Sequence, residues 1–172
     1  LHCIQFLSTQ GTPMSIQVGE RIPEVTLKRI REGVETVDTT TLFDGRKAVL
    51  FAVPGAFTPT CSEKHLPSYV QHFDDFRSRG IEVFCVSVND PFVMQAWGKT
   101  QHVPDGLQML ADGNADLAKA LGLEMDASAY GMGIRAKRFA LYVEDGVVKN
   151  VFVEAPGEYK VSGAEHVLEQ IG

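Results

Sequence analysis

The segment PGAFTPTC at residues 54–61 ends on a thiol and contains two prolines, two threonines and a glycine. An apolar run precedes it and a helical pattern follows it, so we expect Cys61 in the first turn of a helix. The N-terminus of a helix carries about half a positive charge and unpaired N–H groups, and both favour a thiolate. A free cysteine is commonly buried and inert. The constrained loop favours the alternative here, which is a nucleophilic Cys61.

Other residues of the same loop extend the predicted site. Thr58, three residues before Cys61, brings a hydroxyl that can donate to an oxyanion or accept from a peroxide O–H. Pro54 and Pro59 stiffen the loop and remove two N–H donors. Phe57 is placed to exclude water. Together they predict a pre-shaped, partly dry pocket for a thiolate.

The segments that must hold this loop alternate between strand and helix patterns. The run before the loop is continuously apolar and residues 81–88 are mostly so, as in buried strands, whereas 25–31 alternates and 107–111 is short. Helical spacing continues from Cys61 to a stop at Gly80, with an irregular turn expected at Pro67.

The second half of the chain adds two short helices, a loop and a hairpin. Asn89 or Asp90 is expected to cap a helix running through Trp97, and Asp112 or Asn114 the next. We expect 124–137 to be an irregular loop. A hairpin turning at 144–146 follows, and then a last helix that opens on a capping box, Ser162 to Glu165. This order predicts an α/β fold with a mixed central β-sheet and helices on both faces; a thioredoxin-like domain fits it, as do several other α/β folds.

The composition limits the partners of this chemistry. The chain has 172 residues, 44% of them hydrophobic, which suggests one domain with an ordinary core. The net charge of −6 argues against nucleic acid and membrane as partners, because both reward clustered Lys and Arg. The three cysteines include no Cys-x-x-Cys pair and do not form a secreted disulfide framework, so we expect a reducing, cytoplasmic compartment.

The first thirteen residues, LHCIQFLSTQGTP, differ from the rest of the chain. They have no basic segment, and their apolar stretch is too short for a secretory signal. Met14 opens a stretch that is typical of a natural start. We therefore expect residues 1–13, with Cys3, to be a cloning or upstream remnant and residues 14–172 to be a single domain.

Three segments carry a resemblance to a known family. PGAFTPTCSEKHLPSY closely resembles the active-site loop of peroxiredoxins, whose signature is Pro-x-x-x-Thr-x-x-Cys, and its detailed form is similar to the type II group of plants and bacteria. VSVNDPFVMQAWGK at 86–99 resembles the second strand and helix of that group. GIRAKRFALYVEDGVVKNVFVE at 133–154 resembles its arginine-bearing hairpin. The resemblance covers nearly all of residues 14–172.

The resemblance implies a role for each matching residue. Cys61 would be the peroxidatic nucleophile, Pro54 would shield its sulfur and Thr58 would orient the peroxide. Arg138 would supply the positive charge beside the thiolate, a placement that the sequence by itself does not give. The backbone N–H groups of Thr60 and Cys61 would help to hold the peroxide oxygens. The implied protein is an antioxidant thiol peroxidase that reduces hydrogen peroxide and organic hydroperoxides, with no metal or bound organic cofactor.

The second half of the implied cycle is less defined. Cys61 would become a sulfenic acid that must be reduced. Cys85 is a possible resolving partner, although a mid-strand cysteine is usually a core residue and a disulfide needs Cα atoms within about 7 Å. Another branch of the family carries a resolving cysteine where this chain has Ser162. The remaining option is an external thiol, either glutathione with glutaredoxin in trans or thioredoxin. The resemblance also implies a homodimer.

Two rival functions remain open at this stage. A peroxide sensor, redox relay or holdase would use the same thiol but stop after about one equivalent of peroxide. A cysteine hydrolase would need a histidine beside Cys61, and His65 is the nearest candidate. His65 and His72 are seven residues apart with no nearby third ligand, which argues against a metal site.

Overall fold

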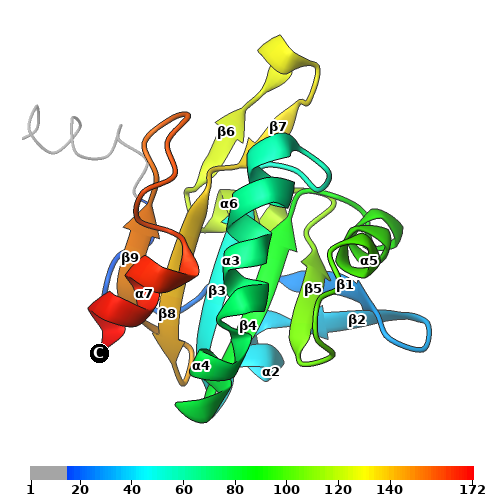
Figure 1. The fold of residues 1–172 in the computed structure, drawn as a ribbon. Helices are drawn as coiled ribbons and strands as arrows, with labels where there is room; N and C mark the ends of the chain where they lie inside the picture. The colour runs from blue at the N-terminus through cyan, green and yellow to red at the C-terminus, as the bar shows by residue number, and fades with distance from the viewer. Residues whose placement is uncertain (1–14) are drawn as a thin grey trace, which may run out of the picture.

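The computed structural model describes residues 15–172, and the expected remnant at 1–13 lies outside the described residues. A seven-stranded sheet forms the centre, with strand order β2-β1-β5-β4-β3-β8-β9 (Figure 1). The pairs β3–β4 and β4–β5 are parallel, and the other neighbours are antiparallel. The mixed sheet predicted from the sequence is therefore confirmed. Its strands are β1 (Thr26–Ile30), β2 (Val34–Asp38), β3 (Lys47–Val53), β4 (Ile81–Ser87), β5 (Leu107–Ala111), β8 (Phe139–Glu144) and β9 (Val147–Val153).

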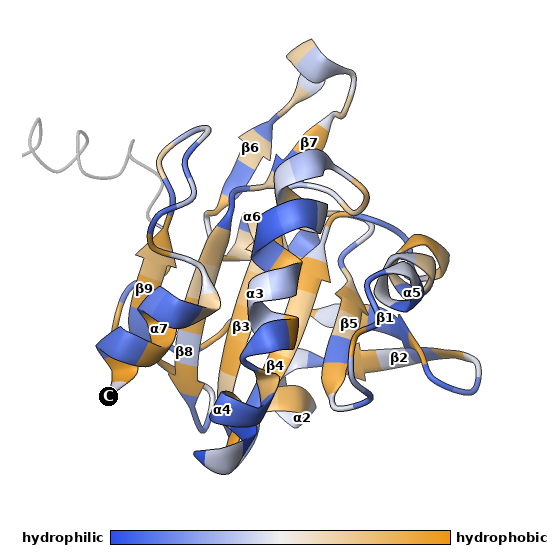
Figure 2. Cartoon of the chain, viewed as in Figure 1, coloured by the Kyte–Doolittle hydropathy of each residue, from blue (hydrophilic) through white to orange (hydrophobic). Residues whose placement is uncertain are grey.

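Helices cover both faces of this sheet, as expected. One core contains residues of α3 (Leu66–Gln71), α4 (Phe73–Ser78), α5 (Pro91–Thr100) and α7 (Ala164–Ile171). The opposite core contains residues of α2 (Thr39–Phe43) and α6 (Asp116–Ala120). Figure 2 shows the strands as mostly hydrophobic and the outer surfaces of the helices as hydrophilic. No helix within residues 15–172 is long and apolar enough to cross a membrane.

Strand β3 divides its side chains between these two cores. Val49, Phe51 and Val53 face the first core, and Ala48, Leu50 and Ala52 face the second. All six are fully buried, which explains the unbroken apolar run. Burying a side chain such as that of Phe51 contributes about 1.5–3 kcal/mol to stability. The strand is thus a fixed base for the loop that follows Val53.

The helix after this loop is irregular near Pro67, as predicted. Leu66 donates its N–H to the carbonyl of Cys61, five residues back, so a π-helical turn, η1 (Cys61–His65), precedes α3. Pro67 has no N–H to donate to the carbonyl four residues earlier, and a widened turn accommodates this. The helical path breaks at His72 and ends at Gly80, whose φ of 74° suits a glycine.

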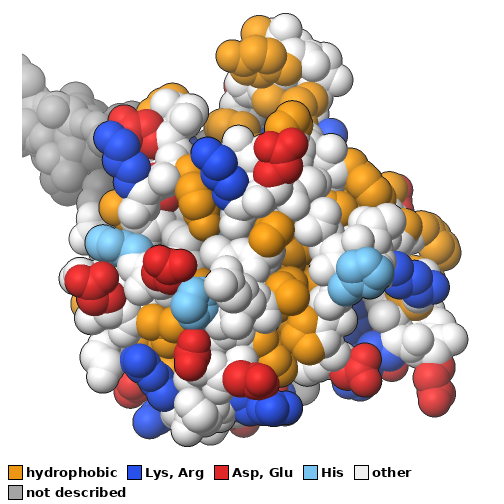
Figure 3. Space-filling model, in the orientation of Figure 1, with side chains coloured by type: hydrophobic (Ala, Val, Ile, Leu, Met, Phe, Trp, Pro, Cys, Tyr) orange, Lys and Arg blue, Asp and Glu red, His pale blue; other side chains and the backbone are white. Residues whose placement is uncertain are grey.

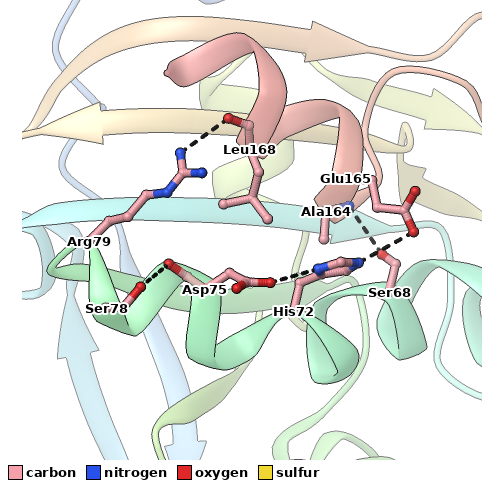
Figure 4. A network of polar contacts seen from close by, with 8 residues as sticks. All are labelled: Ser68, His72, Asp75, Ser78, Arg79, Ala164, Glu165 and Leu168. Atoms are coloured by element: carbon pink, nitrogen blue, oxygen red, sulfur yellow. Dashed lines mark hydrogen bonds and ion pairs between the residues drawn. The ribbon is translucent and has the colours of Figure 1, made fainter.

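The start of the last helix differs from the prediction. Gly163 precedes α7 without a side-chain cap, and the hydroxyl of Ser162 donates to Glu154 instead of capping the helix. The expected capping box was therefore wrong. The N–H of Ala164 is satisfied by Ser68 Oγ at 3.2 Å, and His72 reaches across to α7 through Glu165 (Figure 4). Long-range contacts with α3 have replaced the local cap.

Two further segments depart from the expected elements. Residues 124–137 are not an irregular loop, because β6 (Glu124–Asp126) and β7 (Ile134–Ala136) pair as a small antiparallel hairpin around the turn η2 (Ser128–Tyr130). The tip of this hairpin carries exposed hydrophobic side chains (Figure 3), with Tyr130 83% exposed. Strand β2 was not predicted either; none of its residues is fully buried, and it pairs only with β1.

The helix caps predicted for the middle of the chain are largely confirmed. Asp90 accepts a hydrogen bond from the N–H of Val93 and caps α5, which ends at Thr100 and so extends beyond Trp97. Asp112 accepts from the N–H groups of Leu117 and Ala118. The expected carboxylate therefore satisfies the start of α6, although it lies four residues before Asp116, where the helix begins.

Candidate active site

Cys61 lies in the first turn of the helix, as predicted. The helix begins at Pro59, and its first backbone bond runs from the N–H of Ser62 to the carbonyl of Thr58, at 2.9 Å. The N–H groups of Thr60 and Cys61 precede that bond and have no helical partner. The Cys61 side chain is fully buried. The thiol therefore lies at the positive end of a helix and away from bulk water.

Arg138 reaches the sulfur from a distant part of the chain. Its Nη2 lies 3.3 Å from Cys61 Sγ and donates to it. The register of the sheet explains this contact, because Phe139 at the start of β8 pairs with Ala52 near the end of β3. The residue before β8 is thereby brought beside the loop after β3. The structure thus brings Arg138 beside Cys61, where the family resemblance implied a positive charge.

His65 orients the same arginine. Its Nε2 lies 3.1 Å from the carbonyl of Ser162, which can only accept, so Nε2 carries the proton. The other nitrogen, Nδ1, is then free to accept from Arg138 Nη1 at 3.0 Å. Burial, together with the Arg138 charge, lowers the pKa of His65 from 6.5 to about 3. The imidazole is thus a neutral acceptor that fixes the guanidinium beside the sulfur.

The threonine of the loop is oriented by its own backbone. Thr58 Oγ1 donates to the carbonyl of Gly55 at 2.7 Å, which uses its only proton. Of the two roles open to the hydroxyl, accepting from a peroxide O–H fits this arrangement. The N–H of Ala56 donates to Asn89 Oδ1 at 3.0 Å and fixes the loop to the end of β4. Phe57 adopts a φ of 66° and is 54% exposed, so its side chain forms part of the outer surface.

The comparisons with known proteins agree with this geometry. A model of the Redoxin family matches residues 17–168. The chain is 42% identical over 170 residues to the chloroplastic peroxiredoxin-2E of Arabidopsis thaliana, covering 95% of this chain and 73% of that protein. It is 45% identical over 158 residues to the mitochondrial peroxiredoxin-2F of the same plant, covering 87% and 79%.

A solved structure extends the similarity to three dimensions. Reduced Prx3 of Vibrio vulnificus in complex with hydrogen peroxide superposes with a TM-score of 0.87 at 46% identity, covering 91% of this chain and 99% of that one. The chain belongs to the peroxiredoxin family. Its curated relatives bear type II names, and the thioredoxin-like fold and the thiol peroxidase activity expected from the loop are those of the family. Peroxiredoxin chemistry uses cysteine and needs no prosthetic group.

A groove of this peroxiredoxin lies beside Arg138, the arginine that contacts the buried thiol. It has a volume of about 370 Å³ and is bordered by Pro54, Thr60 and Arg138. The other walls come from the small hairpin and from the loop after β9, and they are formed by Met125, Tyr130, Lys137, Glu154, Ala155, Pro156, Gly157 and Glu158. The surface of the groove is largely apolar, and its charged side chains are those of Lys137, Arg138, Glu154 and Glu158.

Cys85 lies in the middle of β4, where it pairs with Phe51 and Met109. It is fully buried in the same core as Cys61. Burial, with a smaller effect from Cys61, raises the pKa of the Cys85 thiol well above its ordinary value. A neutral thiol in a central strand is a poor nucleophile.

Sequence reasoning missed the residues that support the site from a distance. His65 was considered as a hydrolase base, but both of its ring nitrogens are engaged, by Arg138 and Ser162. Arg135 donates to the carbonyls of Met132, Val88 and Pro54. It therefore ties the small hairpin to the loop that contains Cys61. In the sequence Arg135 stands out only as one of three basic residues, with Lys137 and Arg138, and such clusters are usually solvated.

Proposed function

We propose that Cys61 is the peroxidatic nucleophile of this thiol peroxidase. The contact between Arg138 and the sulfur, at 3.3 Å, is the observation that carries the proposal. A guanidinium donor and a helix N-terminus both stabilise a thiolate relative to a thiol. Within residues 15–172 no other cysteine has such surroundings, since Cys85 lies inside the sheet.

The proposed step transfers one oxygen to the sulfur. The thiolate attacks the terminal oxygen of R–O–O–H, an S–O bond forms and the O–O bond breaks. The sulfur is oxidised by two electrons to a sulfenic acid, and the leaving RO⁻ takes a proton to become water or an alcohol. Arg138 and the N–H groups of Thr60 and Cys61 would stabilise the charge that develops on the oxygens. The hydroxyl oxygen of Thr58 would accept a hydrogen bond from the O–H of the peroxide, and Pro54 would shield the sulfur.

The walls of the groove support organic hydroperoxides as substrates alongside hydrogen peroxide. Met125, Tyr130 and Pro156 line the groove that leads past Arg138. Apolar walls of this kind favour a ligand with an apolar body and one polar reacting end. Phe57 and Thr60 would contact the substrate at the rim.

We propose that an external thiol completes the cycle. A reduced thiol attacks the sulfur of the sulfenic acid and releases water, and a second thiol exchanges with the mixed disulfide and restores Cys61. The position of Cys85 inside β4 supports this route over an internal disulfide. The donor would be glutaredoxin with glutathione, or thioredoxin, in trans.

Assembly and compartment are part of the same proposal. The exposed apolar side chains of Phe57 and Phe92, at 54% and 65% exposure, support a homodimer formed near the active-site loop. The reducing conditions that the cycle requires support a cytoplasmic site of action. The alternative is an organelle, since two of the relatives are named as chloroplastic and mitochondrial proteins.

Turnover tests the proposal directly. Peroxide consumption would be followed with dithiothreitol and then with glutathione and glutaredoxin, using the wild type, Cys61→Ser and Cys85→Ala. We expect many equivalents of peroxide consumed by the wild type and by Cys85→Ala, and none by Cys61→Ser. Consumption that stops after about one equivalent with every donor would favour the peroxide sensor, relay or holdase. Equal activity of Cys61→Ser and the wild type would refute the assignment.

A further inference from the structure

A buried carboxylate closes the loop between β9 and α7. Glu154 follows β9 directly and is only 7% exposed. Its oxygens accept hydrogen bonds at 2.8 Å from the N–H groups of Lys160, Val161 and Ser162, and one at 2.7 Å from Ser162 Oγ. Three consecutive N–H groups thus converge on one carboxylate. Burial alone would raise the pKa of Glu154, but these hydrogen bonds hold it below the usual value.

The same loop holds the group that orients His65. The carbonyl of Ser162 accepts from His65 Nε2 at 3.1 Å and from the hydroxyl of Tyr69 at 2.6 Å. Its N–H points the other way, to Glu154. The carboxylate therefore holds Ser162 through its N–H and hydroxyl, and the carbonyl of the same residue sets the tautomer of the imidazole. His65 in turn accepts from Arg138, which donates to Cys61.

Glu154 also contacts the arginine strand by its backbone. Its N–H donates to the carbonyl of Arg138 at 3.0 Å. Glu154 is therefore linked to Arg138 in two ways. Its backbone N–H binds the backbone of Arg138 directly, and its carboxylate is linked to the guanidinium through Ser162 and His65. Glu154, Ser162 and His65 are buried and Arg138 is half-buried, so most partners on this path lie away from bulk solvent.

We propose that Glu154 is a positioning residue for the peroxidatic reaction, acting on Cys61 through Ser162, His65 and Arg138. This inference rests on the proposed role of Cys61. It assigns a function in the reaction to a residue that touches neither the sulfur nor the peroxide. The loop 155–162 is, in this view, a part of the active site whose shape is set by one carboxylate.

The test compares Glu154→Gln with the wild type and with Glu169→Gln, an exposed charge change on α7. A glutamine removes the negative charge that the loop donors share and, with its oxygen in the place of Oε2, turns an N–H₂ group toward the N–H of Lys160. We expect the rate of Cys61 sulfenic acid formation by hydrogen peroxide to fall about tenfold, which is less than the 10²–10³ lost when a transition-state donor itself is removed. The rate in Glu169→Gln should equal that of the wild type.

A double-mutant cycle separates positioning from general destabilisation. In a His65→Leu background the path is already cut, so adding Glu154→Gln should cause no further loss of rate, although both variants lose stability. If the rate of the double variant falls by the product of the two single-variant losses, the proposal is overturned. An unchanged rate in Glu154→Gln would overturn it as well. If Glu154→Gln does not fold, Ser162→Ala removes one donor to the carboxylate while keeping the carbonyl, and we expect a loss of about twofold to threefold. An unchanged rate would then overturn the proposal.

The wild-type measurement distinguishes the two levels of inference. If Cys61 of the wild type does not form a sulfenic acid, the proposed function itself fails. If it does and the variants behave additively, only the role of Glu154 fails.

Discussion

His65 accepts a hydrogen bond from Arg138 at 3.0 Å, and this contact decides where the guanidinium points. The imidazole can accept only because its other nitrogen donates to the carbonyl of Ser162. A protonated imidazole would repel Arg138 and present no acceptor. The low pKa of His65, about 3, therefore keeps the arginine beside Cys61 throughout the neutral range.

Replacing His65 with leucine should slow the oxidation of Cys61 without abolishing it. Leucine fills most of the buried space but offers no acceptor, so Arg138 loses one of its two fixed contacts. We expect the rate constant with hydrogen peroxide to fall about tenfold, measured by stopped-flow fluorescence. His102→Asn is the matched control, because His102 is exposed and Asn tolerates its φ of 54°. A His65→Leu rate equal to that of the control would show that Arg138 needs no such partner.

The acid stability of the protein should also report on His65. Its pKa falls from 6.5 to about 3 on folding, so between these values the unfolded chain binds a proton that the folded chain does not. Stability therefore decreases as the pH falls below 6.5, by about 1.4 kcal/mol per pH unit from this group. Urea unfolding between pH 7 and pH 5 should show a steeper decrease for the wild type than for His65→Leu. Parallel curves would contradict the assignment of a neutral, buried His65.

The sequence predicted the parts of the site that are local in the chain. The loop at 54–60 and the thiol at the helix start follow from proline, threonine and apolar patterns that span a few residues. Arg138 could be placed only through the family resemblance, because its contact with Cys61 depends on the pairing of β8 with β3. The strands of the central sheet other than β2 were predictable, but their order and register were not.

The supporting residues escaped prediction for the same physical reason. Ser162 and His65 are separated by 97 positions in the chain. The expected capping box had the Ser162 hydroxyl cap α7, but this hydroxyl donates to Glu154 instead. The short strands β6 and β7 have few residues and no clear alternation, so 124–137 was interpreted as a loop. Tertiary contacts decide both cases, and local propensity is a weak guide where such contacts compete.

Oxidation with one equivalent of hydrogen peroxide should modify Cys61 alone. Peptide mapping is expected to find one added oxygen on the Cys61 peptide and an unmodified Cys85, because the Cys85 thiol is buried and neutral. Cys85→Ala should retain full turnover and lose roughly 1 kcal/mol of stability. A Cys61–Cys85 disulfide would instead mean that β4 opens during the cycle, and thioredoxin-like donors would then be favoured.

The contacts between His72 and α7 should stabilise the protein below neutral pH (Figure 4). Hydrogen bonds that His72 donates to the carboxylate of Asp75 and then to that of Glu165 raise the pKa of His72 above 6.5. The stabilisation is therefore present below pH 6.5 and is lost as the pH rises through the folded-state pKa. Since Glu165 is 78% exposed, we expect Glu165→Gln to cost less than about 0.5 kcal/mol at pH 6, and nothing at pH 8.5 or in high salt. Glu169→Gln is the control, and an equal loss at both pH values would refute the ion pair.

Replacing Arg135 with lysine should disturb the loop that holds Pro54. The guanidinium donates to the carbonyls of Met132 at 2.8 Å, Val88 at 3.1 Å and Pro54 at 3.5 Å, which belong to three separate segments. An ammonium group cannot reproduce this planar fork, so at least one carbonyl loses its partner. We expect the rate of Cys61 oxidation to fall severalfold and Tm to fall by a few degrees.

A second arginine separates the effect on rate from the effect on stability. Arg79→Lys changes an arginine that donates to the carbonyl of Leu168, on the α7 side and away from the loop. It should lower Tm without slowing the oxidation of Cys61. If both variants slow the reaction in proportion to their loss of stability, Arg135 serves the fold alone. A slower reaction in Arg135→Lys only would mean that the small hairpin helps to set the position of Pro54 in the loop that precedes Cys61.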